Sequence, residues 1–312
     1  MADVFFAEDE GFYDCLRGSS CAFGVFDGVH LGHRRVLAAV RELAAQAQAI
    51  PAAVTFDPHP RRVVAPDTAP PLLIPLAERV RLLREYGMEE IVVIPFDGAF
   101  ASLPPERFLA ELAERIGDLR GICVGSNWHF GVRASGGIRE LAAFAEARRI
   151  GFTPVPELEM DGRTVSSTEI RRAVSDGRLA EAEKMLGRPY RLSGTVTRGF
   201  RAASGELDCP TANLQCRDGV LPPDGVYAAR AFPADGGTYP AAVNIGFAPT
   251  YRREKAERRT EVHLLDYQGD LYDRPLAVEL FRQLRPERTF PDTDALKQQI
   301  ALDVAEIRKM QR

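Results

Sequence analysis

Two histidines follow a glycine-interrupted turn at residues 22–33, which read AFGVFDGVHLGH. Gly28 and Gly32 let backbone N–H groups approach an anion, and the helix expected from residue 34 adds the positive end of its dipole. His30 and His33 can both donate hydrogen bonds to phosphate oxygens, as a transition state at an α-phosphate requires, without a covalent intermediate. We therefore interpret the stretch as a phosphate site. An ordinary strand-to-helix turn and half of a metal site are the simpler interpretations.

A second cluster lies at residues 165–172, which read VSSTEIRR. Hydroxyl residues before a glutamate are typical of a helix cap, and capping alone would explain Ser166, Ser167 and Thr168. Arg171, one turn into the expected helix, brings a guanidinium to the same helix start. The combination predicts a second phosphate-binding element.

Two loops at strand ends carry further candidates. The segment 57–60, DPHP, is expected to be a rigid, extended loop that holds His59 at the ligand-binding edge of a sheet. The segment 126–137 contains Asn127, Trp128 and Phe130 before a glycine-rich, arginine-bearing tail. These aromatic side chains either stack on a planar ligand or simply anchor the loop to the core.

The carboxy-terminal part has its own constellation. Thr211 and Asn213, in PTAN at residues 210–213, offer hard oxygen ligands of the kind that Mg²⁺ prefers. Glu261 lies on an expected strand, where a carboxylate could take the proton from an alcohol that attacks a γ-phosphate. From these residues alone, a turn and a surface charge are the favoured interpretation.

Alternating helical and strand-like patterns before residue 187 position the first candidates and predict a parallel, doubly wound sheet. The helix at residues 76–87 is expected to carry Glu78 and Arg79 on its polar side, and Pro51 is expected to end the preceding helix. The expected helices cover residues 35–49, 76–87, 105–116, 141–149, 165–172 and 176–186, and the expected strands cover residues 52–56, 91–95, 121–125 and 152–155.

After residue 187 the pattern changes to short strands separated by Gly, Pro and Asp turns, which predicts a closed antiparallel barrel. An amphipathic helix at residues 292–309 is expected to pack on it through Leu296, Ile300, Val304 and Ile307. The sequence thus predicts two domains, at residues 1–186 and 187–312. The expected strands cover residues 192–197, 225–231, 239–245, 260–266 and 276–284.

The composition of the 312 residues argues against nucleic acid and membranes as partners. A formal net charge of −4 gives no basic footprint for nucleic acid. No run approaches the about 18 apolar residues that span a bilayer, and the first ten residues do not resemble a signal peptide. The five cysteines lack metal-ligand spacing, which indicates free thiols, so we expect a cytoplasmic protein without a zinc site. We also expect a monomer or a weak homo-oligomer.

The first stretch resembles the HxGH signature of the nucleotidyltransferase superfamily, and its full form resembles the bacterial bifunctional riboflavin kinase/FAD synthetase family. The segments TFDPHP, SSTEIR, PTAN, VNIG, EVHLLD and LRPE are similar to further motifs of that family, in the same order along nearly the whole chain. The likeness implies a Rossmann-like nucleotidyltransferase domain with a parallel sheet and a riboflavin kinase-like antiparallel barrel with a terminal helix.

The resemblance also implies the chemistry: AMP passes from ATP to FMN, giving FAD and pyrophosphate, and riboflavin is phosphorylated to FMN, with Mg²⁺ and ATP. By the same likeness, His30 and His33 stabilise charge, Glu261 activates the riboflavin hydroxyl, and Thr211 and Asn213 hold Mg²⁺ with Arg285 in the kinase site. The residues implied to bind ATP or flavin in the first domain are Gly24, Phe26, Asp27, Gly28, Gly32, Ser166, Ser167, Thr168 and Arg171 for ATP, and His59, Asn127 and Phe130 for flavin.

One segment departs from the family pattern. The glycine- and arginine-rich loop before PTAN is replaced by GFRAASGELDC at residues 199–209, where Asp208 adds negative charge beside the expected phosphates. Such repulsion is on the order of several kcal/mol. A monofunctional FAD synthetase with an inactive or flavin-binding barrel therefore remains an alternative, as do another HxGH nucleotidyltransferase and a flavin-binding regulator.

Overall fold

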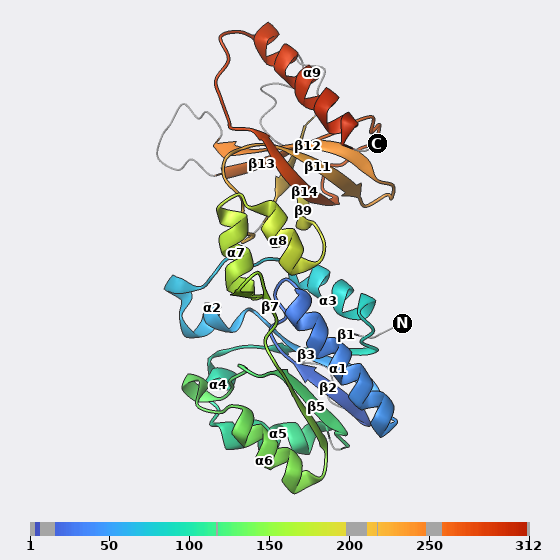
Figure 1. Cartoon of the computed structure of the whole chain (residues 1–312), viewed down its shortest axis with the longest axis vertical. Coiled ribbons are helices and arrows are strands. Elements are labelled where there is room, and N and C mark those ends of the chain that lie inside the picture. The colour runs from blue at the N-terminus through green and yellow to red at the C-terminus, as the bar shows by residue number, and fades with distance from the viewer. Residues whose placement is uncertain are drawn as a thin grey trace. The chain divides into compact units, whose positions relative to one another are not determined.

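The computed structural model describes residues 4–6, 16–116, 118–197, 211–216, 218–247 and 258–310. The chain forms two compact units (Figure 1). The first comprises Met1–Pro70 and Leu76–Ser167, and the second comprises Pro71–Pro75 and Thr168–Arg312. Among the described helices, none combines the length and apolar character that a membrane crossing requires.

The first unit is built on a parallel sheet of six strands in the order β1-β4-β3-β2-β5-β6. A small antiparallel pair, β7 with β8, follows it. The strands are β1 (Val4–Phe6), β2 (Ser19–Phe23), β3 (Ile50–Asp57), β4 (Glu90–Pro95), β5 (Gly121–Gly125), β6 (Gly151–Val155), β7 (Glu159–Met160) and β8 (Arg163–Thr164). The helices are α1 (Leu31–Ala47), α2 (Pro60–Val64), α3 (Leu76–Glu85), α4 (Gly98–Ala101), α5 (Pro105–Ile116) and α6 (Ile138–Arg148).

Helices cover both faces of this sheet. On one face, Phe108 and Leu112 of α5 and Leu141 of α6 join the core formed by the strands. On the other, α1 approaches so closely that a Cβ added at Gly121 would lie 2.5 Å from a methyl carbon of Leu43. The absence of a side chain there lets the helix lie close to the sheet. The predicted parallel, doubly wound architecture is confirmed.

Two prolines have other roles than expected. Helix α1 ends at Ala47, and Gln48 caps it with a left-handed backbone at φ 51°. Pro51 lies inside β3, opposite Ser20 of β2, so it does not end the helix. Pro60 begins α2 directly after His59, which replaces the extended loop expected there, because proline suits the first turn of a helix.

The second unit contains the predicted antiparallel barrel, which closes in the order β10-β13-β12-β11-β14-β9. Strand β10 was not expected: the PTAN segment had been interpreted as a ligand loop or turn. Helices α7 (Ser167–Ser175) and α8 (Leu179–Leu186) precede the barrel, and α9 (Thr293–Lys309) follows it. The strands are β9 (Tyr190–Thr197), β10 (Ala212–Gln215), β11 (Gly225–Pro233), β12 (Tyr239–Phe247), β13 (Arg258–Leu264) and β14 (Pro275–Arg285).

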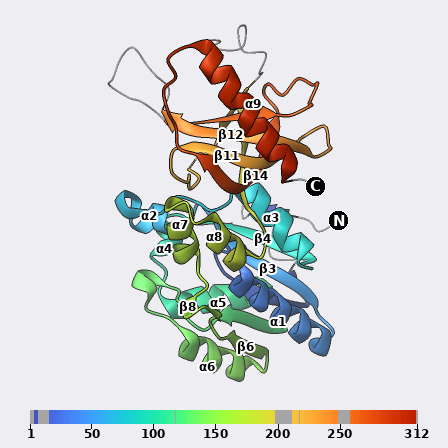
Figure 2. The ribbon, with the colours of Figure 1, turned by 45° about the horizontal axis from the view of Figure 1, so that its top comes forward.

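Helix α9 packs on the outside of the barrel, as its apolar stripe predicts. Asp292 caps it through a hydrogen bond from the N–H of Ala295, 2.8 Å long. Ile307 is buried against Ala228 and Leu265. Figure 2 shows α9 lying over β11 and β12. The helix therefore covers the barrel face on which outward-pointing side chains of these strands lie.

Candidate active sites

The turn between β2 and α1 has an unusual backbone. Three of its residues have positive φ: Phe26 at 52°, Gly28 at 86° and Val29 at 37°. Only glycine adopts this conformation without strain, so the two bulky residues are held there by their surroundings. The N–H of Val29 donates to the carbonyl of Phe26 at 3.1 Å, which closes a tight turn directly before the helix.

His30 caps helix α1 with its side chain. Its Nδ1 accepts a hydrogen bond from the backbone N–H of His33 at 3.2 Å. Because Nδ1 is the acceptor, the proton of the neutral ring resides on Nε2. The first turn of α1 contains no acidic residue that would compete with an anion.

His33 stacks on His30, with ring centroids 3.6 Å apart and planes inclined by 17°. Phe26, which is 1% exposed, meets His33 edge-on at 5.3 Å. A Cβ at Gly24 would lie 3.0 Å from the Phe26 ring, so glycine leaves room for this ring. The structure therefore brings Gly24, Phe26 and both histidines together.

The two phosphate elements meet within the first unit. The hydroxyl of Ser167 donates to the backbone carbonyl of Asp27 at 2.8 Å, across 140 residues of sequence. A Cβ at Gly32 would lie 3.4 Å from the carbonyl oxygen of Val165. The start of the SSTEIR segment thus lies against the HxGH turn.

Thr168 and Arg171 continue α7 in the second unit. Thr168 is exposed, and Nε of Arg171 donates to the carbonyl of Pro71 at 2.7 Å. Ser166, which is half-buried, precedes the helix. The assignment of these three residues to ATP stays a prediction.

Each flavin candidate of the first unit has its own local partners. Nδ1 of His59 accepts from the N–H of Arg61 at 3.1 Å and caps α2. Asn127 is exposed and donates to Glu157 at 2.6 Å. Phe130 is 7% exposed and packs in the core, as the anchoring interpretation expects. Roles in flavin binding stay predictions for all three.

Sequence reasoning missed Arg79, which was expected on the polar side of α3 but is 0% exposed. Its Nη1 donates to the carbonyls of Val25 and Phe56 at 3.1 and 2.8 Å and to the hydroxyl of Thr55 at 3.0 Å. Its Nη2 lies 3.8 Å from a carboxylate oxygen of Asp57. Nothing in the helical period distinguishes an arginine that fills the core from one that faces solvent.

Arg79 also places a charge behind the turn between β2 and α1. Burial lowers the pKa of Arg79 below its usual range, and the negative charges of Asp27 and Asp57 partly offset this effect. Asp27 is itself 1% exposed. A buried guanidinium and a buried carboxylate therefore stabilise each other behind the turn that carries His30.

In the second unit, cross-strand pairing aligns the kinase candidates on one face of the barrel. Asn213 of β10 lies opposite Glu261 of β13, and Glu261 lies opposite Asn244 of β12. Asn244 lies opposite Val226 of β11, which lies opposite Arg285 of β14. Directly opposed residues share a face, so this row points to the outside of the barrel, towards α9.

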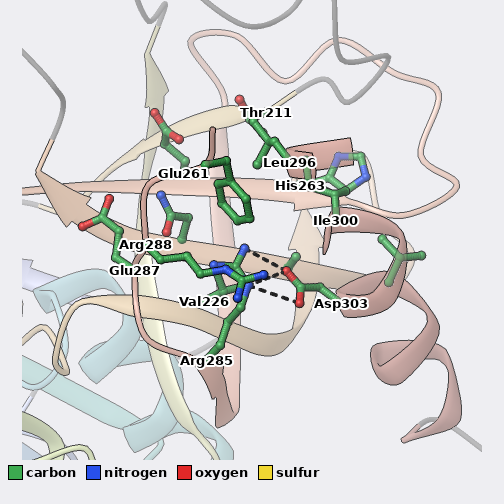
Figure 3. A pocket seen from close by; sticks show the side chains of 14 residues that line it. Thr211, Val226, Glu261, His263, Arg285, Glu287, Arg288, Leu296, Ile300 and Asp303 are labelled. Carbon is green, nitrogen blue, oxygen red and sulfur yellow. Dashed lines mark hydrogen bonds and ion pairs between the residues drawn. The ribbon is translucent and has the colours of Figure 1, made fainter. Parts of the chain in front are cut away.

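A cavity of about 320 Å³ lies between this row and α9. Glu261 and Arg285 line its polar part, and Leu296 and Ile300 of α9 line its apolar part (Figure 3). Val304 of the same helix also lines the cavity. Its mixed lining, apolar with a few polar groups, is typical of a site for a flat organic ligand.

Thr211, which is exposed, lines this cavity and also a second cavity of about 110 Å³. Leu271 and Tyr272 line the smaller cavity. Thr211 therefore lies at the border between the two cavities. Among the described residues, no three His, Cys, Asp or Glu side chains form a metal-binding group.

Glu287 brings a second carboxylate to the larger cavity. Desolvation raises the pKa of Glu287, and the charges of Asp224 and Glu261 raise it further. A Cβ at Gly246 would lie 2.4 Å from an oxygen of Glu287, so this carboxyl rests directly on the glycine backbone. The departure noted at residues 199–209 lies outside the described residues.

Comparisons with known proteins match both parts of the chain. A FAD synthetase family model matches residues 13–169, and a riboflavin kinase family model matches residues 186–311. A solved structure of a macrolide-efflux protein from Streptococcus pneumoniae is 28% identical, with a TM-score of 0.81, and covers 93% of this chain and 94% of its own.

Relatives named bifunctional riboflavin kinase/FMN adenylyltransferase match along the chain. The protein from Pseudomonas fluorescens is 36% identical and covers 94% of this chain and 93% of its own length. The protein from Escherichia coli K12 is 34% identical, with 92% and 90% covered. The chain therefore belongs to the bifunctional riboflavin kinase/FMN adenylyltransferase family.

Proposed function

We propose that this protein makes FAD in two steps: the barrel phosphorylates riboflavin to FMN, and the Rossmann-like part transfers AMP from ATP to FMN. The observation that carries adenylyl transfer is the turn before α1: Nδ1 of His30 accepts from the N–H of His33, which fixes the ring at the N-terminus of the helix, and the hydroxyl of Ser167 donates to the carbonyl of Asp27 in the same turn. We assign this reaction to residues 1–186 and the kinase reaction to residues 187–312.

In adenylyl transfer, a terminal phosphate oxygen of FMN attacks the α-phosphate of ATP, and pyrophosphate leaves. The attacking oxygen is already ionised, so no general base is needed. His30, His33 and the N-terminus of α1 stabilise the negative charge that gathers at the α-phosphate. Ser166, Ser167, Thr168 and Arg171 are assigned to the remaining phosphates, which the contact between Ser167 and Asp27 supports.

In the kinase reaction, Glu261 accepts the proton of the riboflavin 5′-hydroxyl as its oxygen attacks the γ-phosphate of ATP. The carboxylate is flanked by Asn213 and Asn244 on the neighbouring strands. We place the flavin in the larger cavity and the nucleotide towards the smaller one, with Arg285 in the flavin wall.

Mg²⁺ fits the oxygen donors of Thr211 and Asn213, because it accepts few protein ligands when phosphates supply the others. When bound, the ion would neutralise phosphate charge. We also propose a cytoplasmic location, which is supported by the absence of a disulfide at Cys21, Cys123 and Cys216, the cysteines among the described residues.

Two separate assays of the purified protein test the proposal: FMN with Mg-ATP, and riboflavin with Mg-ATP. We expect FAD and pyrophosphate in the first and FMN in the second. His30→Ala should abolish FAD formation and retain FMN formation, and Glu261→Ala should do the converse. FAD from FMN without FMN from riboflavin would instead indicate a monofunctional FAD synthetase.

A further inference from the structure

Helix α9 contributes a buried carboxylate to the wall of the larger cavity. Asp303 accepts hydrogen bonds from Nε of Arg285 at 3.3 and 3.0 Å, one at each oxygen, and lies 3.0 Å from Nη2. The side chains are 16% and 8% exposed for Arg285 and Asp303. Figure 3 shows the guanidinium of Arg285 directed at Asp303. The helix therefore supplies the charged partner that orients Arg285, alongside the carbonyl of Pro286, which accepts from Nη1 at 3.4 Å.

A second residue of α9 holds Asp303 in place. Gln299, one turn earlier, donates from Nε2 to Oδ1 of Asp303 at 2.7 Å, and its own Oε1 accepts from Arg288. The guanidinium carbons of Arg285 and Arg288 lie 5.5 and 4.8 Å from the ring centroid of Phe290. A continuous polar chain thus runs along the cavity wall around one aromatic ring.

Arg285 belongs to the same cross-strand row as Glu261, through Val226 and Asn244. A guanidinium has five N–H donors: Asp303 engages Nε and Nη2, and Nη1 donates to the carbonyl of Pro286 at 3.4 Å, so two faces of the group are held. Pairing with a planar carboxylate fixes the plane of the guanidinium before any ligand arrives, which lowers the entropy lost on binding.

We infer that Asp303 is a positioning residue of the kinase site: it holds Arg285 in the orientation that binds riboflavin, so the terminal helix forms part of this site. The inference rests on the proposed kinase function and on no property of the first unit. It predicts that loss of the Asp303 charge weakens riboflavin binding and leaves the phosphoryl-transfer step nearly intact.

The test is Asp303→Asn in the full chain. We expect the KM for riboflavin to rise at least tenfold, kcat to change less than threefold, and FAD formation from added FMN to stay unchanged in the same preparation. Asp303→Glu should restore part of the affinity. Quenching of riboflavin fluorescence on titration measures binding directly.

Glu306→Gln is the matched control. Glu306 lies on the same helix and pairs with Arg282 of the same strand, but both side chains are about half exposed, at 45% and 52%. We expect this variant to keep the riboflavin KM of the wild type. An equal rise of KM in both variants, or a lower melting temperature for Asp303→Asn with KM unchanged, would show that the carboxylate only docks the helix.

A failure of the kinase proposal is distinguishable. If the wild-type chain forms no FMN, the kinase proposal is wrong, and the riboflavin titration still decides whether Asp303 governs binding. If Asp303→Asn does not fold, Gln299→Ala loosens the carboxylate from its other side and should raise the riboflavin KM in the same direction. An unchanged KM in that variant would count against the inference.

Discussion

In the proposed mechanism, His30 performs two tasks with two different nitrogen atoms. Its Nδ1 completes the first turn of α1, and its Nε2–H donates to the α-phosphate. Capping concerns stability and donation concerns catalysis, so the two tasks can be separated by one substitution. Asparagine is the residue for this purpose, because its side chain caps helices well and carries no imidazole.

We expect His30→Asn to keep the free energy of unfolding within about 0.5 kcal/mol of the wild type, whereas His30→Ala should lose about 1 kcal/mol with the cap. Both variants should lose FAD formation by roughly 100-fold or more, as for other donors to developing charge. Urea unfolding and the FMN assay measure the two effects. FAD formation by His30→Asn at the wild-type rate would remove His30 from the mechanism.

Two cysteines, the buried Cys123 and the half-buried Cys216, give a second residue-scale prediction. Burial raises the pKa of Cys123 and Cys216 to about 12, although hydrogen bonds with Thr153 and Thr260 lower it. The folded protein therefore keeps thiol protons that the unfolded chain releases above its pKa of 9.0. The resulting stabilisation is complete below about pH 9 and is lost as the pH rises towards 12.

At pH 8 we expect iodoacetamide to modify these two thiols slowly in the native protein and rapidly in urea, because only the thiolate reacts. Peptide mass spectrometry distinguishes these two thiols from the other cysteines. The unfolded chain at the same pH serves as the control, and equal rates in the two states would contradict the burial of the thiols.

At the scale of elements, Arg79 connects α3 to β3 and to the turn between β2 and α1. Its contacts with Val25 and Thr55 fix the residues next to the strained Phe26. A sequence pattern identifies the glycines and histidines because the residue type alone indicates what each can do at a turn or at a phosphate. It did not find Arg79, because burial of a charge is decided by tertiary partners, here Asp27 and Asp57.

We expect Arg79→Met to lower the free energy of unfolding by about 3–5 kcal/mol, since it removes the positive charge that interacts with buried Asp27. Arg79→Lys keeps the charge but not the forked contacts, and should reduce FAD formation more than FMN formation. Arg81→Lys is the control on the same helix: its side chain is 48% exposed, and it should cost less than about 1 kcal/mol. Equal losses of both activities in Arg79→Lys would contradict a local role.

A glycine in the barrel carries the next prediction. A Cβ at Gly194 of β9 would lie 2.2 Å from the carbonyl oxygen of Gln215, which is backbone and cannot move aside as a side chain can. We expect Gly194→Ala to destabilise the protein by about 1–3 kcal/mol. Gly98→Ala has open space around its Cβ and should be nearly neutral. Thermal unfolding of the two variants compares them directly.

For the whole molecule, the hydrophobic periods were sufficient to predict a parallel sheet followed by an antiparallel barrel and a helix. Strand β10 escaped because it has four residues and follows a proline, so its alternation of buried Ala212 and Leu214 is too short to stand out. Asp303 escaped for a different reason. An acidic residue among Ile300, Val304 and Ile307 does not indicate a site by itself, because its partner Arg285 lies 18 positions earlier and meets it only in the folded protein.

The path of the chain has a consequence for any attempt to obtain the barrel alone. Leu72 forms a β-bridge with Gly219, with hydrogen bonds of 2.8 Å to the carbonyl of Asp218 and 3.0 Å from the N–H of Val220. A gene fragment that starts at residue 187 would lack Leu72, so the carbonyl of Asp218 and the N–H of Val220 would lose these hydrogen-bond partners. Its product should precipitate or open locally at residues 218–220, and a synthetic peptide of residues 69–77, supplied in trans, should rescue it.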